Sequence, residues 1–465
     1  MGAKPNILLF FTDDQRFDTL GALGHPHVKT PNVDRLMARG TTFTHAHIPG
    51  GTSGAICMPS RAMLHTGRTL FHLEGAGNTV PDDHTMLGER LQQEGYRTFG
   101  TGKWHNGHAA FARSFSDGGE IFFGGMGDHW NVPAFDFDPT GKYDHKLPQC
   151  KEPNTSKNVT IRGGDHVAAG HHSSELFADA VVGFLEDHDT ADPFFAYLAF
   201  MAPHDPRIMP QEFQDMYDPD EIPLPENFMG GHPFDNGDLK VRDEVLTDWP
   251  RDPAEIREHI ADYYAMITHL DAQIGRVLDA LEATGEADNT IIVFAGDNGL
   301  AVGQHGLLGK QNMYEHSIRV PLVMSGPGVP KGEERDAYVY LLDIFPTLCE
   351  LLDIPRPESV EGKSLVPALN SGDEKVRDTL FSAYKEFQRT VKDDRYKLIE
   401  YVVDGTQTTQ LFDLQQDPLE LNNLAGNPDY SDRVAGLRKV MYQWRDEWDD
   451  DKSQWGKIFW DGFSE

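Results

Sequence analysis

Cysteine, basic side chains and long apolar runs are all scarce in this 465-residue chain. Its three cysteines, Cys57, Cys150 and Cys349, are too few and too scattered for a disulfide framework or a cysteine zinc site. No apolar run approaches the roughly 20 residues of a membrane span, and the first one, NILLFF, is too short for a signal-peptide core. The chain as written is therefore predicted to be soluble, cytoplasmic and not membrane-bound, or periplasmic or secreted if a signal peptide has been removed.

Basic residues are outnumbered, with 41 Lys and Arg against 74 Asp and Glu, which gives a formal net charge of −33. A surface of this sign repels phosphate backbones and anionic lipid, so nucleic acids and membranes are not expected as partners. Hydrophobic residues make up 39 % of the chain, which is ordinary for a globular protein.

Apolar runs alternate with amphipathic stretches, a pattern typical of a mostly parallel sheet sandwiched by helices in an α/β fold. The buried strands are expected at Asn6–Phe11, Tyr96–Thr101, Phe194–Met201, Thr290–Ala295 and Arg319–Met324. Helices are expected at Asn32–Arg39, His84–Glu94, Ser173–Glu186 and Ile256–Ala283.

The residue composition and the hydrophobic pattern of the sequence change in two places. Residues 205–255 are rich in Pro, Asp and Gly and are predicted to form a long irregular insertion. After about Lys375, short alternating strands and a helix near Ser431–Trp444 predict a smaller antiparallel α+β subdomain. The expected division is a catalytic domain at residues 1–374 and a C-terminal subdomain at residues 375–465.

Polar clusters follow the carboxyl ends of four predicted strands, the edge at which ligands bind in open α/β sheets. They are Asp13 and Asp14, then Lys103 and His105, then His204, and finally Asp297 and Asn298. Three carboxylates and an amide suit Ca²⁺, with Mg²⁺ as the alternative. Alone, TDD could be a helix-capping turn and GDNG a tight turn, but their coincidence at one edge favours a metal site.

The segment CMPSR adds a thiol to these polar residues. Pro59 suits the first turn of a helix, so Cys57 is expected near a helix N-terminus, where the dipole lowers a thiol pKa. Arg61, one turn later, could hold an oxyanion. Lys103, His105, His204 and Lys310 could hold an anionic group and move protons, although each alone could be an ordinary surface or core residue. Together they predict attack on a tetrahedral oxyanion ester, with plain packing of the thiol as the alternative.

These segments resemble the type I, formylglycine-dependent sulfatases of the alkaline phosphatase superfamily, and carbohydrate sulfatases in particular. CMPSR matches the Cys-x-Pro-Ser-Arg signature of that family, whose cysteine is oxidised after translation. Further segments are similar along nearly the whole chain and in the same order, among them PNILLFFTDD, FMAPHDP, TIIVFAGDNG and GKQNMYEHSIRVPLVMSGPG.

The resemblance implies a role for each site residue. Asp13, Asp14, Asp297 and Asn298 would bind Ca²⁺ together with Cys57 converted to 3-oxoalanine (formylglycine), whose hydrate supplies the nucleophile. Arg61, Lys103 and Lys310 would neutralise sulfate oxygens, and His204, with or without the help of Lys310, would protonate the leaving alcohol. His105 would accept a proton as sulfate is expelled. Asn78 and Arg207 are weaker candidates for substrate contacts.

The resemblance also implies two partners: a sulfated small molecule or oligosaccharide as substrate, and a formylglycine-generating or other sulfatase-maturing enzyme. Two alternative functions stay open. Phosphonate and phosphodiester hydrolases of the same superfamily share the modified cysteine, and a non-catalytic sulfoglycan-binding protein could keep the fold. No oligomeric state is predicted.

Overall fold

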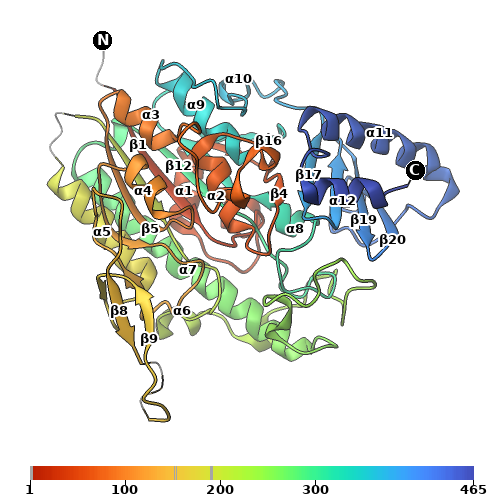
Figure 1. The fold of residues 1–465 in the computed structure, drawn as a ribbon, viewed down its shortest axis with the longest axis horizontal. Helices are drawn as coiled ribbons and strands as arrows, with labels where there is room; N and C mark the ends of the chain where they lie inside the picture. The colour runs from red at the N-terminus through yellow and green to blue at the C-terminus, as the bar shows by residue number, and fades with distance from the viewer. Residues whose placement is uncertain (1–3, 151, 153, 189–191, 465) are drawn as a thin grey trace.

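An eight-stranded, mostly parallel sheet forms the centre of the computed structural model, which describes residues 4–150, 152, 154–188 and 192–464 (Figure 1). In spatial order its strands are β15 (Glu333–Arg335), β2 (Gly40–Phe43), β14 (Leu322–Ser325), β12 (Thr290–Gly296), β1 (Asn6–Thr12), β11 (Phe194–Ala199), β5 (Arg97–Lys103) and β6 (Asp117–Phe122). The strands from β12 to β6 run parallel, whereas β14 is antiparallel to both of its neighbours. The predicted α/β class is confirmed.

Helices cover both faces of this sheet. Every residue of the central strands β1 and β12 is therefore buried. In β1, the side chains of Ile7, Leu9 and Phe11 join one core cluster, and those of Leu8 and Phe10 join the other. The first cluster is closed by α2 (Cys57–Thr66), α3 (Leu87–Gln93), α4 (His108–Ser114), α9 (Ile344–Leu351) and α10 (Val366–Asn370). The second is closed by α1 (Pro31–Ala38), α5 (Ser173–Asp187) and α7 (Pro253–Ala283).

One predicted strand, Arg319–Met324, is in fact two. Pro321 has no N–H to donate to a ladder, and the chain changes sheet at this residue. Before it, β13 (Arg319–Val320) joins β3 (Ala46–His47) and β16 (Val339–Tyr340) in a separate three-stranded sheet. After it, β14 enters the central sheet beside β12.

Two predicted helices start at other residues because capping groups decide where a helix begins. The helix expected at His84–Glu94 begins at Leu87, where the Glu89 carboxylate accepts from the Met86 N–H. The helix expected at Ile256–Ala283 begins at Pro253, because Asp252 accepts from the next two free N–H groups. The insertion at residues 205–255 is irregular apart from α6 (Gln211–Gln214), two 3₁₀ turns and the first residues of α7.

A five-stranded sheet lies at the C-terminal side of the molecule (Figure 1). It contains β17 (Leu380–Tyr384), β18 (Gln388–Lys392), β19 (Tyr396–Val403) and β20 (Thr406–Asp413), with α11 (Ser431–Glu447) and α12 (Gln454–Gly462) beside it. Its edge strand, β4 (Gly50–Gly51), comes from far earlier in the chain. A Cβ on Gly50 would lie 1.9 Å from the Ala383 carbonyl oxygen, so only glycine permits this approach. The loop leading to Cys57 is thereby fixed against the C-terminal sheet.

The remaining elements are short. They are the ribbons β7 (Pro133–Ala134) with β10 (His166–Val167) and β8 (Lys146–Gln149) with β9 (Thr160–Gly163), and the helix α8 (Glu315–Ile318). Across the described ranges, no helix combines the length and apolarity needed to cross a membrane.

Candidate active site

The predicted polar clusters converge at the carboxyl edge of the central sheet. Asp13 and Asp14 follow β1, and Asp297 and Asn298 follow its neighbour β12. On the other side of β1, His204 follows β11, and Lys103 ends β5. All six of these side chains are buried, although they carry charge or hydrogen-bonding groups. Their burial therefore requires partners within the protein or a ligand.

The acidic residues leave two oxygen atoms free to bind a cation. Asp13 Oδ1 and Asn298 Oδ1 are buried and have no hydrogen-bond partner in the part of the chain that the structure describes. Ligand atoms of Asp13, Cys57 and Asp297 lie within 4.8 Å of one another. Burial raises the pKa of Asp297, and so does repulsion from the nearby Asp13 carboxylate. These residues fit a hard divalent cation such as Ca²⁺, which takes carboxylate and amide oxygens.

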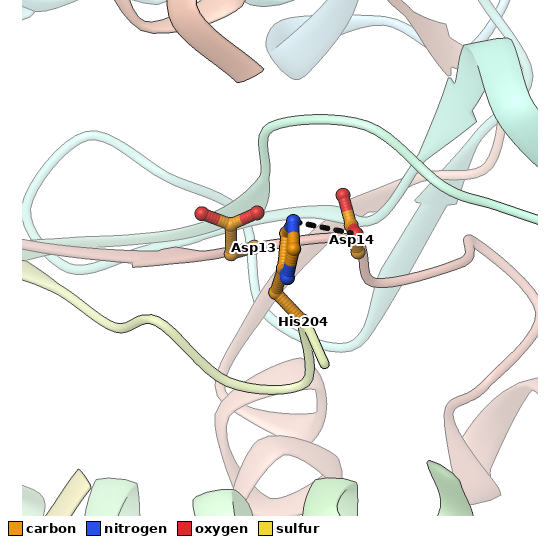
Figure 2. Close-up of side chains that lie close together, drawn as sticks. All are labelled: Asp13, Asp14 and His204. Carbon is orange, nitrogen blue, oxygen red and sulfur yellow. Dashed lines mark ion pairs between the residues drawn. The ribbon is translucent and has the colours of Figure 1, made fainter. Parts of the chain in front are cut away.

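A second group of possible ligand atoms lies beside the first, in Asp13, Asp14 and His204 (Figure 2). The His204 Nε2 atom lies 3.6 Å from Asp14 Oδ2. Its Nδ1 atom lies 2.7 Å from the Asp205 carbonyl oxygen, which fixes the ring orientation. Asp14 adopts a φ of 62°, and its N–H donates to Asp297 Oδ1 at 3.1 Å. The two strand ends are therefore tied together directly.

Arg61 is fully buried, and each of its five N–H groups has an acceptor within hydrogen-bond distance. Nε and Nη2 donate to Asp297 Oδ2 at 3.1 and 3.0 Å, and Nη2 also donates to Asp13 Oδ2 at 3.0 Å. Nη1 donates to the Lys103 carbonyl oxygen at 2.7 Å and to the Tyr197 hydroxyl at 3.5 Å. The guanidinium thus orients the acidic residues and has no free N–H for a sulfate, which differs from the oxyanion contact expected from the sequence.

Cys57 is the first residue of α2, at the helix N-terminus as predicted. Its Sγ atom lies 3.5 Å from both Lys103 Nζ and His105 Nδ1. The expected lowering of its pKa is wrong: burial raises the thiol pKa, and the nearby Lys103 and Lys310 offset this only in part. As a thiol, Cys57 is a poor nucleophile at neutral pH.

Two lysines stay charged in this buried setting. Lys310 Nζ lies 2.6 Å from Asp14 Oδ1, which also accepts from Asn298 Nδ2 at 2.7 Å. Burial disfavours the charged forms, but Asp14 raises the pKa of Lys310 and Asp13 raises that of Lys103. By contrast, burial and Lys103 lower the pKa of His105 to about 3, so that imidazole is neutral and able to accept a proton.

The two weaker candidates lie elsewhere. Asn78 is exposed, directly after the 3₁₀ turn at Gly75–Gly77. The half-buried Arg207 donates to His259 Nδ1 at 3.0 Å and stacks over the Tyr263 ring. Neither side chain has a contact with the buried cluster.

Sequence reasoning missed the groups that connect the insertion to this cluster. Gln311, next to Lys310, donates to Asp243 Oδ2 at 2.7 Å and to the Gly54 carbonyl oxygen at 2.8 Å. Arg242 forms an ion pair with Asp205, the residue after His204. Only the fold identifies these contacts, because Arg242 and Asp243 lie outside the matched segments, and the segments that contain Asp205 and Gln311 do not indicate their partners.

Comparison with known proteins gives two family matches. The family described as sulfatase matches residues 5–354, and that described as N-sulphoglucosamine sulphohydrolase, C-terminal, matches residues 303–447. A sulfatase of Formosa agariphila is 30 % identical over 96 % of this chain and 88 % of its own length. The N-acetylglucosamine-6-O-sulfatase of Bacteroides thetaiotaomicron is 25 % identical over 96 % of this chain and 87 % of its own. A solved structure in complex with its substrate D-glucosamine-2-N,6-O-disulfate has the same fold, with a TM-score of 0.77 and 23 % identity, and the match covers 98 % of this chain and 99 % of that one.

Proposed function

Because this chain belongs to the sulfatase family, the sulfuric ester hydrolases of the alkaline phosphatase superfamily, we propose that it hydrolyses a sulfate ester of a carbohydrate with formylglycine made from Cys57 and one bound Ca²⁺. The observation that carries this proposal is the pair of buried, unpartnered oxygens of Asp13 and Asn298 beside Cys57 and Asp297. Mg²⁺ is the alternative cation.

The residues that would hold the cation are Asp13, Asp14, Asp297, Asn298 and the modified residue 57. When bound, the cation and the hydrated aldehyde would supply a hydroxyl nucleophile of lowered pKa. The oxidation of Cys57 requires a maturing enzyme, and it removes the disadvantage of a thiol whose pKa burial raises.

The basic residues would neutralise charge, position the acidic residues and transfer protons. Lys103 and Lys310 carry the charge that neutralises sulfate oxygens, and Arg61 holds Asp13 and Asp297 in place. His204, with or without the help of Lys310, would donate a proton to the leaving alcohol, and the neutral His105 would accept one as sulfate departs.

A carbohydrate substrate is supported by the names of the relatives and by the surroundings of the site. Of the relatives above, one is named an N-acetylglucosamine-6-O-sulfatase and another was solved with D-glucosamine-2-N,6-O-disulfate as its substrate. The insertion at residues 205–255 reaches the site through Asp243, which accepts from Gln311, and through Asp205, which contacts His204 and is paired with Arg242. We propose that this insertion selects the sugar, with Arg207 and Asn78 as outer contacts.

We further propose residues 1–374 as the catalytic domain and residues 375–465 as the subdomain that closes one side.

The test uses protein made together with a sulfatase-maturing enzyme. We expect the mass of the Cys57 peptide to match the aldehyde or its hydrate, and we expect release of sulfate from a sulfated sugar. Cys57→Ala, made in parallel, should lose turnover by about 10,000-fold or more and keep its melting temperature, because it removes the nucleophile and little packing. Full activity of an unmodified thiol form would contradict the proposal, and faster turnover of the matched phosphonate or phosphodiester would replace it with the alternative function.

A further inference from the structure

The segment that carries His204 is held at both ends by buried histidines that no motif identified. His129 Nε2 lies 3.1 Å from the His204 carbonyl oxygen. His172 Nε2 lies 2.9 Å from the Ile208 carbonyl oxygen. A carbonyl oxygen only accepts hydrogen bonds, so both imidazoles carry their proton on Nε2 and donate it.

The second nitrogen of each ring has a donor that fixes this tautomer. Ser173 Oγ lies 2.7 Å from His129 Nδ1, and the Ser174 N–H donates to His172 Nδ1 at 3.2 Å. The two rings stack with centroids 5.1 Å apart and planes 10° apart, and both side chains are fully buried. Burial lowers the pKa of His129 to about 4 and that of His172 to about 3, so both are neutral near pH 7.

The donors belong to the start of a rigid element. Ser173 and Ser174 are the first residues of α5, His172 is its N-cap, and the Ser173 N–H donates to the His129 carbonyl oxygen at 2.8 Å. Helix α5 packs on the central sheet beside α7. The histidine pair therefore connects a packed helix to an irregular loop, and it does so through the backbone of the residue whose side chain faces Asp14 (Figure 2).

We propose that His129 and His172 are positioning residues, a clamp on residues 204–208 that holds the His204 imidazole where it can protonate the leaving group. The inference rests on the proposed function, in which His204 is the general acid. A misplacement of about 1 Å in such a group can cost about 100-fold in rate. The two histidine contacts hold the loop backbone at residues 204 and 208, and the ion pair of Arg242 with Asp205 holds one side chain between them.

The experiment compares two aryl sulfates that differ in how much the leaving group needs a proton. Phenyl sulfate releases a basic phenolate, whereas 4-nitrophenyl sulfate releases a stable anion. In His129→Phe, which keeps an aromatic ring and removes the donor, we expect kcat for phenyl sulfate to fall about 100-fold and kcat for 4-nitrophenyl sulfate to fall less than about 10-fold. His172→Phe should show the same pattern as His129→Phe, with the larger loss of kcat on phenyl sulfate. His129→Gln, whose amide can reach the same carbonyl, should restore most of the phenyl sulfate rate.

Two controls separate positioning from loss of stability. Leu185→Ala opens a cavity at the far end of α5 and should lower the melting temperature while leaving both rates within about 2-fold. In a His204→Ala background, His129→Phe should cause no further loss, because the residue that it positions is gone.

Equal losses on both substrates, or a further loss in the His204→Ala background, would overturn the clamp while leaving the sulfatase proposal intact. A wild-type enzyme that carries formylglycine but releases sulfate from neither the aryl sulfates nor a sulfated sugar would instead refute the proposed function, and the clamp with it.

Discussion

Two clusters of buried charge lie in this protein, and they have different chemistry. The active-site cluster contains Asp13, Asp14, Asp297, Arg61, Lys103 and Lys310. The Glu315 cluster, between α8 and the C-terminal sheet, contains His47, Glu315, Lys392, Lys397 and Glu420. In the Glu315 cluster, Glu315 Oε2 lies 2.8 Å from Lys392 Nζ, and Oε1 lies 3.1 Å from Lys397 Nζ. Lys397 Nζ also lies 2.8 Å from Glu420 Oε1.

Neither burial nor charge balance distinguishes the two clusters. The active-site cluster pairs three carboxylates with three cations, and the Glu315 cluster pairs two carboxylates with two lysines. The difference lies in the acceptors: both oxygens of Glu315 face a cation, and Glu420 Oε1, which accepts no hydrogen bond, still lies 2.8 Å from Lys397 Nζ. Asp13 Oδ1 and the neighbouring Asn298 Oδ1 have neither a hydrogen bond nor an ion pair among the residues described. An unpartnered buried acceptor therefore points to a ligand, and a fully paired one points to a structural junction.

The largest effect expected from this contrast is on Ca²⁺ binding and on the activity that depends on it. Asp297→Asn keeps the shape of the side chain and removes its charge, so we expect kcat to fall about 100- to 1000-fold. Ca²⁺ at 100 times its Kd should stabilise the chelated wild-type protein by about 2.7 kcal/mol and should not stabilise the variant. Thermal melting with and without added Ca²⁺ measures this.

Glu315→Gln is the matched control for that experiment, because it removes one buried carboxylate from the other cluster. It should retain the full shift in melting temperature on adding Ca²⁺. A reduced shift would show that the two clusters are coupled and would remove the distinction between them.

The second effect is on stability. Glu315→Gln leaves Lys392 without its carboxylate and leaves Lys397 with Glu420 alone, and breaking a buried pair in this way costs about 3–5 kcal/mol. Urea unfolding at pH 7 should show this loss. Activity at low temperature should stay within about 2-fold of wild type, because no member of the Glu315 cluster contacts the site.

The stability that the Glu315 ion pairs contribute should disappear at low pH. Burial opposes ionisation of Glu315, but Lys392 and Lys397 hold its pKa well below 4.5. A lowered carboxyl pKa adds stability that is present above the unfolded pKa and is lost as the pH falls through the folded one. The wild-type free energy of unfolding should therefore decrease more steeply below about pH 4.5 than that of Glu315→Gln. Parallel decreases would contradict the assignment.

The smallest effect is expected outside both clusters. Arg207→Ala removes a guanidinium that donates to His259 and stacks over the Tyr263 ring. If this group meets a second anionic group of the substrate, KM for a disulfated glucosamine should rise about 3-fold with kcat unchanged, as for an exposed charge pair. KM for the monosulfated sugar is the control and should not change. A fall in kcat on both substrates would place Arg207 in the support of His204 instead.

Much of this protein is determined by the order of its residues. Apolar runs predicted the central strands, because a parallel strand covered on both faces must be apolar throughout. The polar residues after those strands predicted the site, because parallel strands end at the same edge. The assignment of Cys57 to a helix N-terminus was correct for the same local reason, the proline in the first turn.

Only the tertiary structure decided the rest. The pKa of Cys57 is raised rather than lowered because packing removes water from the thiol, and no neighbour in the sequence reports that burial. Arg61 supports Asp13 and Asp297 and does not face a sulfate, because strands distant in the chain bring four acceptor atoms to its five N–H groups. The histidine clamp depends on a loop, a helix N-terminus and a strand end that meet in space. Local sequence sets which groups are available, whereas burial and long-range contacts set their charge and partners.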